Sequence, residues 1–99
     1  MSDGLTFSED APQYLVTIVN KRGLHARAAA KFVKTTETFE AQVGVTRNGL
    51  TVSGRSIMGL MMLAAAPGTE INITADGPQA SDVLKALKIL VEAGFDEED

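Results

Sequence analysis

The sequence predicts an α+β fold in which three helices cover one face of a four-stranded antiparallel sheet. Residues 39–46 and 70–75 alternate apolar and polar side chains, which gives a strand one buried face and one face in water. Asn48-Gly49 predicts a two-residue hairpin turn, because both residues of that turn need positive φ. Apolar residues at helical spacing between positions 80 and 91 predict a closing helix. The order of elements is βαββαβα.

The first half of the chain supplies two strands, a helix and a hairpin. Residues 14–20 are rich in β-branched types and predict the first strand. A helix over 26–37 would bury one face, and a second strand would follow within 39–46. The third strand, Leu50–Ser53, then pairs with the second. The residues expected to point inward are Ala29, Phe32, Val33 and Thr36 on the helix, and Phe39, Ala41, Val43 and Val45 on the strand.

The second half begins with Ser56, a predicted N-cap for a short helix from Ile57 to about Leu63. Pro67-Gly68 predicts a turn before the fourth strand, and Gly94 is the expected C-cap of the last helix. The domain is expected to span 14–94, with a flexible N-terminal extension at 1–13 and an acidic tail at 95–99. The inward positions are Ile71, Ile73 and Ala75 on the strand, and Ala80, Val83, Leu84, Leu87, Leu90 and Val91 on the helix.

Composition narrows the class of protein. The chain has 99 residues and no cysteine, which predicts one domain without disulfides. No segment approaches the roughly 20 apolar residues of a membrane span, and no secretory signal is evident, so a soluble cytoplasmic protein is expected. The net charge is −4, yet residues 15–95 hold nine basic residues against six acidic ones. Five basic residues fall within 21–34, where there is no acid; such a field suits an anionic ligand or an acidic partner.

The only histidine, His25, lies where a loop is expected to become a helix, two residues before Arg27. With no second histidine and no cysteine, His25 has no obvious metal site to join. No cofactor is expected either. Imidazole is a competent nucleophile near neutral pH, and the amides of Ala26 and Arg27 would meet a phosphoryl group on it. A helix dipole contributes about 0.3–1 kcal/mol. A charge-assisted bond from Arg27 would contribute about 1.5–3 kcal/mol, so Arg27 should supply most of the stabilisation of the phosphoryl group. These are the parts needed to form and hold a phosphohistidine, but a single histidine at a helix start is often only a cap, so both interpretations stand on the residues alone.

Two further features bear on where the phosphate would come from and which proteins would bind. The chain has no glycine-rich Lys-Ser/Thr loop, so it is not expected to draw phosphate from ATP unaided. The short helix at 57–63 is apolar nearly all round. If Leu60 and Leu63 face the sheet, Ile57, Met58 and Met61 are left exposed as a docking surface. The alternative is burial of the whole segment.

Three segments resemble the HPr-type histidine phosphocarriers of the phosphoenolpyruvate-dependent phosphotransferase system, over roughly residues 14–94. They are Gly23-Leu24-His25-Ala26-Arg27-x-Ala29-Ala30, Asn48-Gly49, and Ser56-Ile57-Met58-Gly59-Leu60-Met61. The resemblance implies an open-faced β-sandwich. It implies that enzyme I, charged from phosphoenolpyruvate, phosphorylates His25 on Nδ1, and that the group then passes to an EIIA-type protein. The chain would be a monomeric phosphoryl carrier rather than a stand-alone catalyst.

The resemblance also implies roles for other residues. Arg27 matches the arginine that neutralises the phosphate, and Ser56 matches the regulatory serine that an HPr serine kinase/phosphorylase modifies in some branches. The partner-docking positions are Ala30, Lys34, Ile57, Met58 and Met61. The family usually has proline where this chain has Ala28, and an N-terminal extension of about ten residues is not typical. Sugar transport and a nitrogen- or carbon-regulatory relay both stay open.

Alternatives outside phosphotransfer are an HPr-like regulatory docking module and a small ligand-binding module with a ferredoxin-like order of elements. An RNA-binding domain is disfavoured, because its sheet would present stacking aromatic residues. The open-face positions here are Glu40, Gln42, Thr46, Glu70, Asn72 and Thr74, and none is aromatic.

Overall fold

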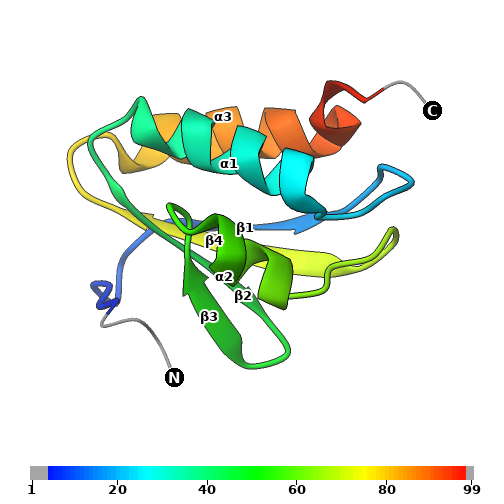
Figure 1. Cartoon of the computed structure of the whole chain (residues 1–99). Helices are drawn as coiled ribbons and strands as arrows, with labels where there is room; N and C mark the ends of the chain where they lie inside the picture. Colours follow the sequence, from blue (N-terminus) through cyan, green and yellow to red (C-terminus); the bar gives the residue numbers. More distant parts are fainter. Residues whose placement is uncertain (1–4, 98–99) are drawn as a thin grey trace.

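The computed structural model describes residues 5–97 and has the predicted order of elements (Figure 1). The strands are β1 (Gln13–Thr17), β2 (Gln42–Arg47), β3 (Leu50–Ser53) and β4 (Glu70–Asp76). The helices are α1 (Ala26–Glu37), α2 (Ile57–Met62) and α3 (Ala80–Glu92), and a short 3-10 turn, η1, spans Gly94–Asp96.

The four strands form one antiparallel sheet in the order β1-β4-β2-β3. Asn48 and Gly49 connect β2 to β3 with φ values of 50° and 80°, as a type I′ turn requires. Val45 of β2 faces Ile73 of β4, and both side chains are buried. The alternation of β2 and β4 therefore places their apolar residues on a single face of the sheet.

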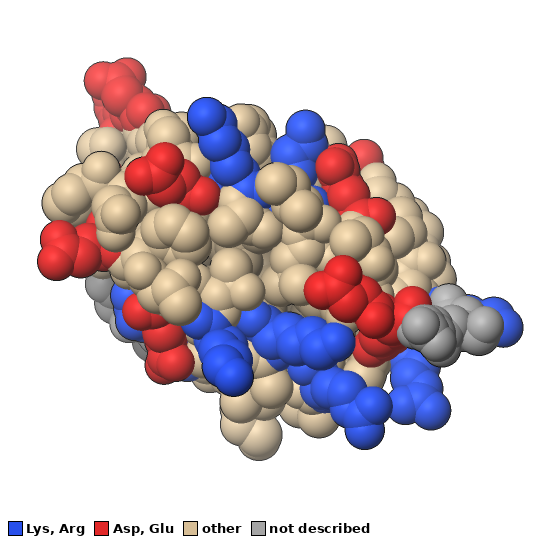
Figure 2. Space-filling model, turned by 90° about the horizontal axis from the view of Figure 1, so that it is seen from above, with Lys and Arg blue, Asp and Glu red and all other residues tan. Residues whose placement is uncertain are grey.

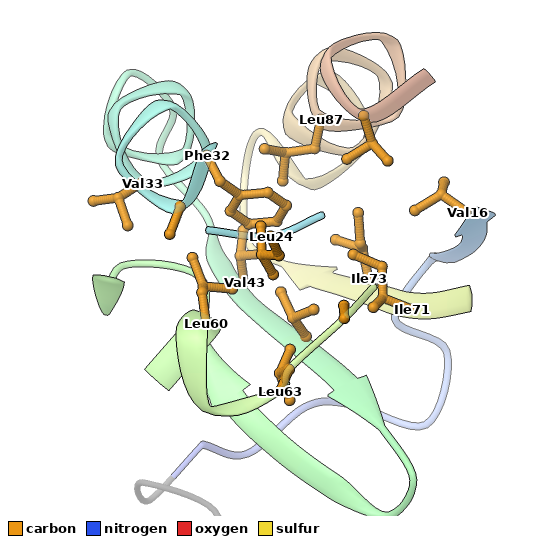
Figure 3. Close-up of a cluster of buried hydrophobic side chains, with 14 of the residues drawn as sticks. Val16, Leu24, Phe32, Val33, Val43, Leu60, Leu63, Ile71, Ile73 and Leu87 are labelled. Carbon is orange, nitrogen blue, oxygen red and sulfur yellow. The ribbon is translucent and has the colours of Figure 1, made fainter. Parts of the chain in front are cut away.

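The three helices cover that face (Figure 1). Phe32 of α1 lies between the helices and the sheet, among Leu87 of α3, Leu60 of α2 and Val43 of β2 (Figure 3). All four of these side chains are at most 2% exposed. The predicted open-faced sandwich with helices on one side is confirmed.

Two predicted strand starts or ends were wrong. The first strand, expected over 14–20, ends at Thr17, because Ile18 bonds instead to the loop before β4, donating its N–H to Thr69 O at 2.9 Å. The second strand begins at Gln42 rather than Phe39. The Phe39 N–H donates to Thr36 O at 3.2 Å, so Phe39 belongs to the turn that ends α1.

The described residues before β1 and after α3 contact the domain more closely than the sequence suggested. The ring of Phe7 lies against Gly44 on the open face, so closely that a Cβ added to this glycine would be 2.8 Å from the ring. The Ser8 N–H donates to Asp76 Oδ2 at 2.9 Å. After α3, Gly94 adopts a φ of 65°, which turns Phe95 into the core, where it is 0% exposed. The division into extension, domain and tail stays a prediction, and the described parts of the outer segments pack against the sheet and the helices.

None of the helices within residues 5–97 has the length and apolar character needed to span a bilayer.

Candidate functional site

The loop before α1 is held in place by contacts that fix the position of His25. Asn20, which is buried, donates from Nδ2 to Gly23 O at 2.8 Å. Leu24 N–H donates to Ala65 O at 2.9 Å. Gly23 has a φ of 64°, and a Cβ at this position would lie 2.4 Å from Ala65 O, so only glycine fits here. The next two residues bring the chain to the start of α1.

His25 is the N-cap of α1, as predicted. Its backbone is extended, with φ −82° and ψ −179°, and its Nδ1 accepts the Arg27 N–H at 3.3 Å. The first amides of a helix have no partner inside it, and the first turn of α1 contains no acidic residue. The Nδ1 side of the imidazole therefore faces hydrogen-bond donors and the positive end of the helix dipole, a favourable place for an anion.

The opposite ring nitrogen, Nε2, faces Glu97, a residue that was not predicted to belong to the site. It pairs with Glu97 Oε2, and Glu97 Oε1 accepts a hydrogen bond from Asn20 Nδ2 at 2.9 Å. The His25 side chain is 23% exposed and that of Glu97 13% exposed. The sequence does contain one signal that the chain turns back after α3. Phe95 is an apolar residue just after the glycine at which the helix ends, and such a residue commonly packs back on its helix.

Glu97 is an ionised acceptor at neutral pH. The hydrogen bond that Glu97 accepts from Asn20, and then the one that it accepts from His25, hold the pKa of this carboxyl below its ordinary value, and burial opposes them. The positive charge of Arg22 lowers this pKa as well, to a smaller degree.

The basic residues of α1 have different surroundings. Figure 2 shows Lys and Arg side chains gathered along one side of the helical face. Lys31 is half-buried and donates from Nζ to Phe95 O at 2.6 Å. Arg27 and Lys34 are exposed. Within residues 5–97 the Arg27 guanidinium makes no hydrogen bond to His25, so its predicted contact with a phosphate stays a prediction.

A shallow cavity of about 250 Å³ borders His25. Arg22 lines it on the side of the histidine loop, and Ala64 and Pro67 line it from the loop after α2. This space suits a small ligand, and Arg22 places a positive charge on its lining.

Ser56 is the N-cap of α2, as predicted, and its Oγ accepts the Gly59 N–H at 2.9 Å. The side chain is half-buried. A regulatory phosphorylation of Ser56, and the kinase/phosphorylase that it would need, stay predictions.

The apolar helix α2 divides as expected into buried and exposed residues. Leu60 and Leu63 are at most 3% exposed, whereas Ile57, Met58 and Met61 are 40%, 73% and 41% exposed. Met62 is 68% exposed as well and was not predicted. Because α2 packs beside α1, whose Ala30 and Lys34 are exposed, apolar and basic residues are available on neighbouring helices.

Comparisons of sequence and of structure both relate this chain to known proteins. A family model described as "PTS HPr component phosphorylation site" matches residues 13–93. A phosphocarrier protein HPr of Neisseria meningitidis is 49% identical over 82 residues, which cover 83% of this chain and 92% of that relative. One from Pseudomonas aeruginosa is 48% identical over 87 residues, covering 87% and 97%. A crystal structure of HPr from Thermoanaerobacter tengcongensis matches with a TM-score of 0.84 and 39% identity, over 89% of this chain and 99% of that one.

Proposed function

Because this chain belongs to the HPr family of the phosphotransferase system, we propose that His25 accepts a phosphoryl group from phosphorylated enzyme I and passes it to an EIIA-type protein. The observation that carries the proposal is the position of the imidazole at the start of α1, with Nδ1 against the Arg27 amide at 3.3 Å. A nucleophilic nitrogen thus lies where a helix N-terminus stabilises the anion that it would receive.

The step needs no further reactant. The lone pair of Nδ1 forms a bond to phosphorus while the bond between phosphorus and the donor breaks, and the donor keeps that electron pair. The Arg27 N–H, which Nδ1 accepts in the free protein, then donates to a phosphoryl oxygen. In onward transfer the N–P bond breaks, its electrons return to Nδ1, and the acceptor's nucleophile takes the phosphoryl group.

Incubation with enzyme I and ³²P-labelled phosphoenolpyruvate tests this function. We expect one label per chain that is lost in acid and kept in base, because protonating a phosphoramidate makes the ring a good leaving group. Adding an EIIA-type protein should remove the label, and the EIIA that does so fastest identifies sugar transport or a regulatory relay. A chain that stays unlabelled would instead be the docking module without phosphotransfer.

Arg27→Ala is expected to slow labelling and onward transfer about fivefold to tenfold, because an exposed guanidinium contributes less to a phosphate than a buried one. Its stability should change little, because the side chain is exposed. Lys85→Ala is the matched control, since it removes one exposed positive charge from α3 instead. Rates measured by rapid quench should separate the two variants; equal rates would mean that the helix amides hold the phosphate without Arg27.

We propose that Ala30, Lys34, Ile57, Met58 and Met61 form the docking patch for both partners. The exposure of the three α2 residues, beside a positively charged helix, supports this assignment. One surface that serves two partners requires them to bind in turn rather than together.

Met58→Glu should weaken binding of enzyme I and of the acceptor by about 1–3 kcal/mol, because it places an unpaired charge in an apolar contact. Met58 is 73% exposed, so the fold should be unaffected. The control is Ile89→Glu, which alters an apolar side chain that is 68% exposed on α3, outside the docking patch. Calorimetric affinities that are equal for the two variants would contradict the assignment.

A further inference from the structure

We infer that Glu97 is a positioning residue for phosphoryl transfer: it holds the ring proton of His25 on Nε2 and so leaves the lone pair of Nδ1 free for phosphorus. This inference rests on the proposed function. The family model matches residues 13–93 and so does not include Glu97.

The two ring nitrogens of His25 face groups of opposite kind. Nδ1 lies 3.3 Å from the Arg27 amide, which is a donor only, so Nδ1 must present its lone pair. Nε2 faces Glu97 Oε2, and an ionised carboxylate accepts only, so Nε2 must carry the proton. The partner of one imidazole nitrogen determines the state of the other. Both contacts therefore select the tautomer in which Nδ1 is the nucleophile.

Glu97 is itself held in place from two sides. Asn20 Nδ2 donates to Glu97 Oε1 at 2.9 Å and to Gly23 O at 2.8 Å. The reversed amide would place its oxygen against two acceptors, so these bonds fix its orientation. Lys31 bonds to the carbonyl of Phe95, a buried residue two positions before Glu97. The loop before α1, α1 itself and the turn after α3 thus position one carboxylate.

The carboxylate also bears on the transfer step. When Nδ1 bonds to phosphorus, the ring gains a positive charge that is shared with Nε2, and the Nε2–H donates to Glu97. When the phosphoryl group leaves, the electron pair returns to Nδ1 and the proton stays on Nε2. No proton has to enter or leave the ring in either direction, and the same contact stabilises the charged ring in both.

The chain has a single histidine, so ¹⁵N NMR of the imidazole reports this tautomer without overlap and without phosphate. The variants are Glu97→Ala, which removes the carboxylate, and Glu97→Gln, which keeps an acceptor oxygen but not the charge. Asp96→Asn is the control, because it removes a neighbouring exposed charge. Thermal melts establish that each variant is folded.

We expect Glu97→Ala to raise the fraction of the Nδ1–H tautomer and to slow labelling by enzyme I about tenfold. Glu97→Gln should recover the Nε2–H tautomer and part of the rate, and Asp96→Asn should match the wild type in both. Unchanged ¹⁵N signals in Glu97→Ala would overturn the inference, as would labelling as fast as or faster than in Asp96→Asn. A wild-type chain that enzyme I leaves unlabelled would contradict the proposed function instead, while the tautomer measurement would still test Glu97.

Discussion

Replacing His25 with alanine is expected to abolish labelling by enzyme I and phosphoenolpyruvate. It removes the only imidazole in the chain, and no other side chain has a nucleophilic nitrogen that is largely unprotonated near neutral pH. The fold should persist, because the change removes one capping hydrogen bond of 3.3 Å and a contact to a partly exposed carboxylate. Loss of an N-cap costs about 1 kcal/mol.

His25→Asn separates the chemistry from the cap. Asparagine is among the best N-cap residues, so this variant should keep α1 intact and be more stable than His25→Ala in urea unfolding. It should still take up no label. Acid-labile phosphate on either variant would show that the group resides elsewhere and would remove the central claim.

Gly23→Ala is expected to lower stability by more than about 2 kcal/mol and to slow transfer together with it. A φ of 64° costs a non-glycine residue about 1–2 kcal/mol. In addition, the new Cβ would lie 2.4 Å from the backbone oxygen of Ala65, and a backbone atom cannot move away cheaply. The loop must shift, which disturbs the Leu24 N–H bond to Ala65 and with it the position of His25.

Gly68→Ala is the matched control for this effect. Gly68 has a φ of 87°, yet no atom lies within 4 Å of an added Cβ, so only the conformational cost of about 1–2 kcal/mol applies. Urea unfolding should place Gly23→Ala well below Gly68→Ala, and only the former should transfer slowly. Equal losses of stability would mean that the close approach to Ala65 is relieved without cost.

Local patterns predicted most of the fold because they follow directly from backbone geometry. The alternation in β4 and the Asn48-Gly49 turn each specify one conformation, and both are present in the structure. Strand ends were harder to predict, because they depend on partners far along the chain. Ile18 has the composition of a strand residue but bonds to the loop at Thr69, and nothing near Ile18 in the sequence indicates that.

In the candidate site, too, the local features could be predicted from the sequence and the long-range contacts could not. His25 as the cap of α1 follows from its neighbours, whereas the contact of its Nε2 depends on Glu97, 72 residues away. The same applies to Asn20, which bonds to Glu97 across 77 residues. In the sequence Glu97 stands among acidic residues that resemble a solvated tail, and only the turn at Gly94 brings it back to the helix N-terminus.

The burial of Phe95 means that the packed core extends beyond the residues that the family model matches. The family match covers residues 13–93, but the ring of Phe95 is 0% exposed, and burying such a side chain contributes about 1.5–3 kcal/mol. Trimming the chain to residues 13–93 would remove part of the core as well as the carboxylate that faces His25.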